Sequence, residues 1–172
     1  MTELKLLLNY LGVSDCNMQE GSLRVDANIN LHIPTPEGKV ATPIVEVKNM
    51  NSFRAVERAL ALEAGRQYEA WNETGIKMGD PGGNKTTRGW DEQAQVTRPQ
   101  RQKEESSDYR YFPDPDLVPV IVTSEEVDRI KASLGELPVA IRKRLESTYG
   151  IDSYDSDVIV NQGRSLVDYY VE

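Results

Sequence analysis

The chain has a single cysteine, no long apolar run and no excess of basic residues, and each absence limits what it can be. Cys16 alone cannot form an intramolecular disulfide, which fits a reducing compartment. No apolar stretch approaches the length that crosses a bilayer. A formal net charge of −8 argues against a free-standing, non-specific nucleic-acid binder, although contact with one shaped RNA end stays open. We therefore expect a cytoplasmic protein that does not bind membranes.

The size and composition are those of a soluble globular protein. With 172 residues, 38% of them hydrophobic and 28% charged, the chain can form one domain, or one domain and the beginning of another. A leucine-rich helix is predicted over residues 2–11, directly after Met1. The last helical pattern stops in mid-repeat at Glu172. We therefore expect a fragment of a longer protein.

The most informative stretch covers residues 17–51, which predicts two strands joined by a Pro/Gly turn. Apolar and polar residues alternate strictly between Leu23 and Ile33, and strand geometry sends them to opposite faces. With the turn centred near Pro36, an antiparallel register places Asp26 opposite Glu46 and Arg24 opposite Lys48. The hairpin then carries these four side chains on one face.

Like charges directly opposite each other destabilise a strand pair, so this predicted register implies a cation between Asp26 and Glu46. Mg²⁺ suits two carboxylates and leaves positions open for phosphate oxygens. Arg24 and Lys48 would then bind those phosphates. The alternative is a solvated outer face on which diagonal ion pairs only stabilise the hairpin.

The remaining patterns predict mainly helices. Asn51 or Ser52 caps a helix that runs to about Asn72, stops at Gly75 and covers the odd-numbered face of the hairpin. Its apolar stripe is predicted to contain Phe53, Val56, Leu60, Ala64, Gln67 or Tyr68, and Trp71. Beyond residue 122 we expect a helix capped by Ser124, a helix over residues 138–149, and one or two short helices over residues 152–172.

Between these helices the sequence predicts a loop over residues 75–89, a second hairpin over 86–103 and an edge strand within 107–122. The second hairpin is the most basic part of the chain and includes Arg101, although its charges also suit a solvated edge. Tyr109, Arg110 and Tyr111 could stack on a base and hold phosphate. An aromatic cluster that closes a core explains the same three residues equally well.

Five motifs, in one order, resemble the B subunits of aspartyl/glutamyl-tRNA amidotransferases (GatB). They are MQEGSLRVDAN (18–28), EVKNMNSF (46–53), TRGWDE (87–92), RQKE (101–104) and DYRYFPDPD (108–116). The resemblance covers nearly the whole chain. It implies an α+β fold, an antiparallel sheet with helices covering one face in a glutamine synthetase-like cradle over residues 1–122, followed by the start of a helical domain over 123–172.

The resemblance also implies an activity. Enzymes of this family use ATP and Mg²⁺ to phosphorylate the side-chain carboxylate of Glu on tRNA(Gln), or of Asp on tRNA(Asn). Ammonia that the amidotransferase A subunit releases from glutamine then displaces the phosphate, and a small C subunit braces the pair. The sequence does not say which of the two tRNAs is the physiological substrate.

Roles carry over from the family residue by residue. Asp26 and Glu46 match acids at the metal and phosphoryl-transfer site, Arg24 and Lys48 match the bases beside them, and Asn28 matches the amide two positions on. We therefore expect Asp26 and Glu46 as metal ligands, Arg24 and Lys48 as ATP-binding and catalytic residues, and Asn28 as catalytic. Asp91, Arg101 and residues 108–110 also match family positions; Arg101, Tyr109 and Arg110 are candidate contacts to the tRNA end.

We expect three segments of the family to have no counterpart in this chain: a first strand with a Glu-x-His pair that completes the metal site, an acid-containing segment before the leucine-rich helix, and the tail that helps to bind the tRNA body. We therefore expect the 172 residues alone to bind Mg²⁺ weakly and to be inactive. The alternatives to a catalytic fragment are a non-catalytic scaffold that presents tRNA within the same complex, and an independent small ATP-dependent ligase.

Overall fold

The computed structural model of the chain describes residues 1–100 and 112–172. It divides into two compact units, Asn17–Tyr109 and a helical unit that joins Met1–Cys16 to Arg110–Glu172. The division expected between residues 1–122 and 123–172 stays a prediction. The confirmed part of the expected fold class is α+β, with a helical C-terminal region.

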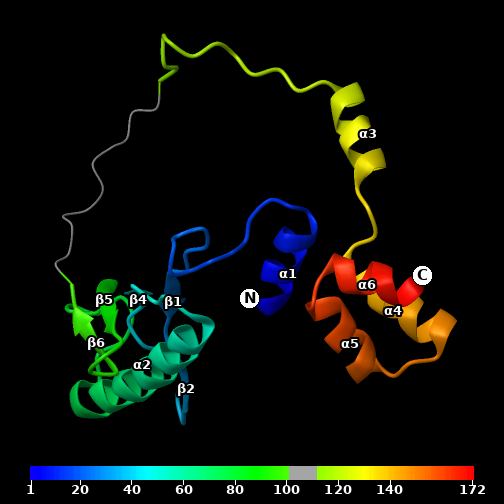
Figure 1. The fold of residues 1–172 in the computed structure, drawn as a ribbon. Coiled ribbons are helices and arrows are strands. Elements are labelled where there is room, and N and C mark those ends of the chain that lie inside the picture. Colours follow the sequence, from blue (N-terminus) through cyan, green and yellow to red (C-terminus); the bar gives the residue numbers. More distant parts are fainter. Residues whose placement is uncertain (101–111) are drawn as a thin grey trace. The chain divides into compact units, whose positions relative to one another are not determined.

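A four-stranded sheet forms the centre of the Asn17–Tyr109 unit (Figure 1). Its strands are β1 (Ala27–Ile29), β4 (Val45–Lys48), β5 (Thr86–Asp91) and β6 (Val96–Pro99), in the order β1-β4-β5-β6. The β1–β4 and β5–β6 pairs are antiparallel, but β4 and β5 are parallel, so the expected antiparallel sheet is mixed. Parallel neighbours require a long crossover, and the helix between β4 and β5 supplies it.

The predicted first hairpin is split between two sheets. β2 (His32–Thr35) and β3 (Gly38–Ala41) form a separate two-stranded sheet whose turn contains Pro36 and Glu37. Only the part nearer to the ends of the hairpin, β1 and β4, enters the main sheet. The second predicted hairpin is confirmed as β5–β6 within the described residues, and Pro99 lies on an edge strand, as expected.

The helix α2 (Phe53–Thr74) is confirmed with both of its ends. The Ser52 hydroxyl accepts a hydrogen bond from the backbone N–H of Ala55, and Gly75 ends the helix with a left-handed φ of 66°. Of the two alternatives for one position of the predicted stripe, Gln67 is buried and Tyr68 is half exposed. The buried residues are Ala55, Val56, Ala59, Glu63 and Gln67, so small and polar side chains form much of the contact face.

The apolar core of this unit lies between α2 and the odd-numbered face of the first hairpin, as expected. Its buried members are Val45, Val47, Met50, Ala55, Val56, Ala59 and Trp90. α2 packs on β1 and on β6, so it crosses the sheet from one edge strand to the other. The even-numbered face of β1 and β4 carries the polar side chains.

The helical unit contains α1 (Thr2–Tyr10), α3 (Ser124–Ser133), α4 (Pro138–Tyr149), α5 (Ser153–Asn161) and α6 (Arg164–Val171). Its buried cluster consists of Leu6, Ile141, Leu145, Val160 and Val167. The helix predictions are confirmed, except that Thr123 caps α3 in place of Ser124. Thr123 and Glu126 form a reciprocal capping box there.

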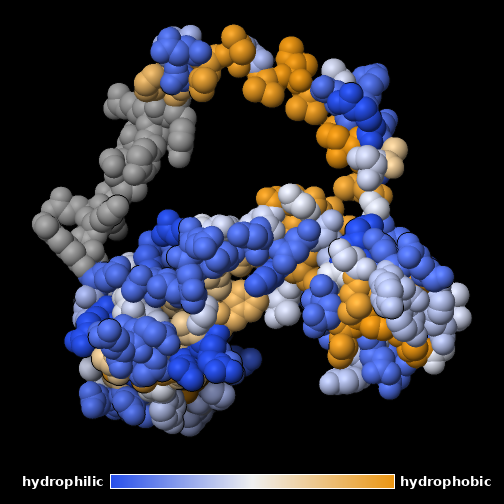
Figure 2. All heavy atoms as spheres, viewed as in Figure 1, coloured by the Kyte–Doolittle hydropathy of each residue, from blue (hydrophilic) through white to orange (hydrophobic). Residues whose placement is uncertain are grey.

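The strand expected within residues 107–122 is absent from the described part, which begins at Phe112. Val118, Val120 and Ile121 are at least 80% exposed, and Figure 2 shows apolar atoms along this segment. The apolar pattern favours a strand, but no neighbouring strand pairs with the described residues here. No helix in the described parts of the chain has the length and apolar character to cross a membrane.

Candidate functional site

Charged side chains form an alternating row on the open face of the sheet. The Lys48 Nζ atom lies 3.6 Å from Asp26 Oδ2 and 3.6 Å from Glu46 Oε1. On the other side of Glu46, the Lys85 Nζ atom lies 3.6 Å from Oε2. The side chains of Asp26 and Lys48 are each 38% exposed and that of Glu46 is 22% exposed. The predicted carboxylates therefore share one face and one cation.

The register that brings these residues together differs from the predicted one by two residues. Asn28, not Asp26, lies opposite Glu46, and the same register continued by one residue places Asp26 opposite Lys48. Because side chains alternate with a period of two, a shift of two residues keeps every side chain on its predicted face. The predicted like-charge pairs are wrong, and opposite charges face each other instead.

A bulge accounts for half of this shift. The turn between β2 and β3 is centred between Pro36 and Glu37, not on Pro36. Two residues, Asn30 and Leu31, connect β1 to β2. Three residues, Thr42, Pro43 and Ile44, connect β3 to β4 on the opposite side of the hairpin. The segment between β3 and β4 therefore has one extra residue. A continuous hairpin in the β2–β3 register would place Glu46 and Asp26 on opposite faces. The bulge restores the shared face.

Thr42 holds this bulge from a buried position. Its Oγ1 atom accepts a hydrogen bond from the Leu31 N–H at 2.8 Å and donates to Gln67 Oε1 at 2.7 Å. The Thr42 N–H in turn donates to the Leu31 carbonyl oxygen at 2.9 Å. The irregular segment is therefore tied both to the opposite strand and to α2.

A pocket of about 220 Å³ adjoins the charge row. Arg24, Asp26 and Lys48 line it together with Asn49, Asn51 and Gln100, three polar residues that were not predicted as site residues. Asn49 has a left-handed φ of 66°, and its Nδ2 atom donates to the Trp90 carbonyl oxygen at 3.0 Å. The EVKNMNSF motif could have pointed to both asparagines, because they directly follow the charged strand.

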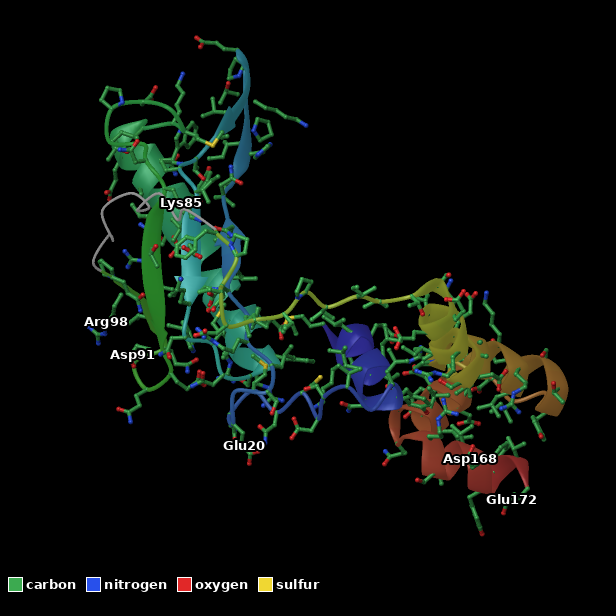
Figure 3. All side chains as sticks on the ribbon, turned by 90° about the horizontal axis from the view of Figure 1, so that it is seen from above. Glu20, Lys85, Asp91, Arg98, Asp168 and Glu172 are labelled. Carbon is green, nitrogen blue, oxygen red and sulfur yellow. The ribbon has the colours of Figure 1, made fainter. Side chains whose placement is uncertain are left out.

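Two further neighbours of Glu46 come from β5 and the loop before it. Thr87 lies opposite Glu46 in the parallel β4–β5 pair, with its Oγ1 atom 3.4 Å from Glu46 Oε2. Lys85, labelled in Figure 3, directly precedes β5. Neither residue could be assigned to the site from sequence, because the parallel pairing of β4 and β5 was not predicted.

The opposite, helix-covered face of the sheet contains a buried charge network around Glu63. The side chain of Glu63 is 0% exposed and accepts hydrogen bonds from Arg66, Gln67 and Thr97, while Arg88 Nε lies 3.5 Å from Glu63 Oε2. Burial raises the pKa of the Glu63 carboxyl, but the hydrogen bonds and charge outweigh burial and hold the pKa below its ordinary value. Desolvation lowers the pKa of Arg88.

The donor set on the open face fits a hard divalent cation. Carboxylate and amide oxygens are the ligands that Mg²⁺ prefers, and Asp26, Glu46 and Asn28 supply them. The Lys48 ammonium group already places positive charge between the two carboxylates. No group of three His, Cys, Asp or Glu side chains is found within residues 1–100 and 112–172, so most ligands of such a cation would be water or phosphate.

The three candidate contacts to the tRNA end, Arg101, Tyr109 and Arg110, lie outside the described residues. Just before them, the hairpin β5–β6 presents Asp91 and Arg98, which form an ion pair with a distance of 2.8 Å between Nε and Oδ2 (Figure 3). Two backbone N–H groups of the turn, from Gln93 and Ala94, also donate to Asp91. Asp91 therefore stabilises the hairpin turn.

Comparison with known proteins gives consistent matches. A family model described as the GatB/GatE catalytic domain matches residues 1–128. The B subunit of the aspartyl/glutamyl-tRNA(Asn/Gln) amidotransferase of Rhodopirellula baltica is 59% identical over 170 residues, which are 99% of this chain and 34% of that protein. The B subunits of the same name from Carboxydothermus hydrogenoformans and Crocosphaera subtropica are 45% and 47% identical over 100% and 98% of this chain. The chain thus spans about a third of the length of these relatives.

Proposed function

The chain belongs to the GatB/GatE catalytic domain family, and on that premise we propose that it is the phosphoryl-transfer part of a tRNA-dependent amidotransferase. In this reaction the side-chain carboxylate of Glu on tRNA(Gln), or of Asp on tRNA(Asn), attacks the γ-phosphorus of ATP and ADP leaves. Ammonia then displaces inorganic phosphate to give the amide. A carboxylate requires this activation because its oxygen is otherwise a poor leaving group.

The observation that supports the proposal is the charge row beside the pocket. Phosphoryl transfer is mainly a matter of position and of charge neutralisation, so it requires cations held in fixed places. Lys48 and Arg24 line one pocket with Asp26, and the Lys48 ammonium group lies 3.6 Å from Asp26 and from Glu46, so both cations lie beside the acids that would bind the metal. We assign Lys48 and Arg24 to the phosphates of ATP, and Asn28, opposite Glu46, to orientation of the reacting groups.

Asp26 and Glu46 would hold Mg²⁺. When bound, Mg²⁺ supplies neutralisation of the charge that develops on the phosphate oxygens. The chain's own residues then do the positioning: Thr87 contacts Glu46 from β5, and the Thr42 bulge keeps Glu46 on the same face as Asp26.

The remaining expectations are part of the same proposal. We assign the sheet and α2 to a larger, glutamine synthetase-like cradle over residues 1–122, followed by the helical segment 123–172, and we place the complex in the cytoplasm. Its partners would be the amidotransferase A subunit, which is the glutaminase, the small C subunit and the mischarged tRNA. Arg101, Tyr109 and Arg110 remain candidates for the tRNA end.

Amidation by the complete B subunit, assembled with its partner subunits, tests the proposal. Asp26→Asn and Glu46→Gln should each abolish ammonia-dependent amidation of Glu-tRNA(Gln) or Asp-tRNA(Asn), while glutaminase activity, tRNA binding and assembly persist. Glu69→Gln, an equal loss of charge at an exposed position of α2, is the matched control. Unaffected amidation in both site variants would refute the proposal and favour a non-catalytic, tRNA-presenting role.

A further inference from the structure

From the geometry around Glu46 we infer that Lys85 is a third cationic binding residue of the site, one that moves from Glu46 to a bound polyphosphate. Because Lys85 competes with a metal ion for the same carboxylate, it makes metal binding at Asp26 and Glu46 depend on polyphosphate. The inference rests on the proposed function and assigns a role to the glycine-rich loop before β5.

The two oxygens of Glu46 are contacted by two different ammonium groups. Lys48 Nζ lies 3.6 Å from Oε1 and Lys85 Nζ lies 3.6 Å from Oε2. Lys48 also contacts Asp26. The row Asp26, Lys48, Glu46, Lys85 therefore contains two negative and two positive charges, and it is neutral before any ligand binds.

The backbone around Lys85 is fixed at several points. The Met78 N–H donates to the Ala41 carbonyl oxygen at 2.9 Å, and the Thr86 N–H donates to that of Ile44 at 3.1 Å. A Cβ atom added at Gly83 would clash with the Lys77 carbonyl oxygen, so the loop requires glycine at this position. The loop thus presents Lys85 at the start of β5, beside Glu46 in β4, with its side chain 51% exposed.

A divalent cation that binds to Asp26 and Glu46 must displace both ammonium groups from these carboxylates. Each displaced ammonium group has three N–H donors without their carboxylate acceptor, and it lies close to a divalent cation that repels it. A polyphosphate that chelates the metal offers oxygens to Lys48 and Lys85 and restores neutrality. Metal and polyphosphate should therefore strengthen each other's binding by the same factor.

Calorimetric titration of the 172-residue chain with Mg²⁺ alone, and with Mg²⁺ plus inorganic tripolyphosphate, tests the inference. In Lys85→Gln we expect Mg²⁺ alone to bind about threefold more tightly, because a screened competitor for Glu46 is lost. We expect Mg²⁺–tripolyphosphate to bind about tenfold more weakly, because a charge-assisted contact is lost. Lys39→Gln removes the same charge from β3 and should change neither constant. Circular dichroism verifies that each variant is folded.

Changes of opposite sign in Lys85→Gln, with Lys39→Gln like the wild type, support the inference. If Lys85→Gln weakens the binding of both Mg²⁺ and Mg²⁺–tripolyphosphate, Lys85 has a structural role and the inference is overturned. If Lys85→Gln leaves both dissociation constants unchanged while Lys48→Gln reduces the binding of Mg²⁺–tripolyphosphate, the inference is overturned and the proposed function stays intact. Absence of Mg²⁺–tripolyphosphate binding by the wild-type chain would also overturn it, and the amidation assay then decides the proposed function separately.

Discussion

Replacement of Glu63 should destabilise the Asn17–Tyr109 unit more than any loss of charge at an exposed position. The side chain is fully buried, and Arg66, Arg88, Gln67 and Thr97 all direct polar hydrogens or charge toward it. In Glu63→Ala all four groups lose their common partner; Gln67 and Thr97 stay buried and Arg88 stays largely buried, whereas Arg66 is 36% exposed and can turn to solvent. Removal of one partner from a buried charge pair costs about 3–5 kcal/mol, and we expect a loss of this size.

Glu63→Gln separates the charge from the hydrogen bonds. The amide keeps an acceptor oxygen for Arg66 but carries no charge to balance Arg66 and Arg88, so we expect a loss of about 1–3 kcal/mol. Glu69→Gln on the exposed side of the same helix should stay within about 0.5 kcal/mol of the wild type. Both tryptophans, Trp71 and Trp90, belong to this unit, so urea unfolding followed by tryptophan fluorescence reports on it directly.

The pH dependence gives a second measurement on the same residue. Because the folded-state pKa of Glu63 is lowered, its contribution to stability is fully present above the unfolded-state pKa of about 4.3 and is lost as the pH falls through the folded-state value. The difference in unfolding free energy between wild type and Glu63→Gln should therefore narrow below about pH 4.3. A loss under about 1 kcal/mol in Glu63→Ala, or a difference that does not change with pH, would refute this account of the buried network.

Substitutions at three further positions test local features. Ser52→Ala removes the hydroxyl that caps α2 and should cost about 1 kcal/mol in urea unfolding, whereas Ser52→Asp should retain most of the stability. Gly75→Ala places a side chain at a φ of 66° and should cost about 1 kcal/mol in the same assay; no loss would show that the helix end rearranges. Leu145→Ala empties a fully buried position between the helices and should cost about 2–5 kcal/mol, measured as loss of helical ellipticity on heating.

Local signals made much of the fold predictable. The cap at Ser52, the stop at Gly75 and the proline that begins α4 are properties of a few adjacent residues, and the predicted helices are present. Strict alternation along residues 23–33 also placed Asp26 on the correct face, because parity survives an error of two residues in register. The family motifs then selected Asp26, Glu46 and Lys48 from the other charged residues.

Pairings over long distances were not predictable from the same signals. Nothing in the sequence of β5 indicates that it lies parallel to β4, so Lys85 and Thr87 were not connected with Glu46. The burial of Glu63 was not predictable either. A carboxylate is buried only where partners satisfy it, and the partners of Glu63 come from β5, β6 and α2. Within the described residues 112–122 the expected strand is absent for a related reason: an apolar pattern shows that a segment can enter a sheet, but not which strand it pairs with.

The Thr42 bulge gives the last prediction, because the shared face of Asp26 and Glu46 depends on the extra residue that it contains. Thr42→Val keeps the shape of the side chain but leaves the Leu31 N–H without its acceptor and Gln67 Oε1 without its donor. We expect a loss of about 1–3 kcal/mol in urea unfolding of the Asn17–Tyr109 unit.

Thr42→Ser is the matched control, because it restores the hydroxyl and lacks only a methyl group. If the serine variant is as unstable as the valine variant, packing of the methyl group holds the bulge, and the hydrogen bonds do not. If serine restores stability, the hydroxyl is the cause. Since the bulge sets which face Glu46 occupies, Thr42→Val should then also weaken the binding of Mg²⁺–tripolyphosphate, whereas Thr42→Ser should bind it as the wild type does.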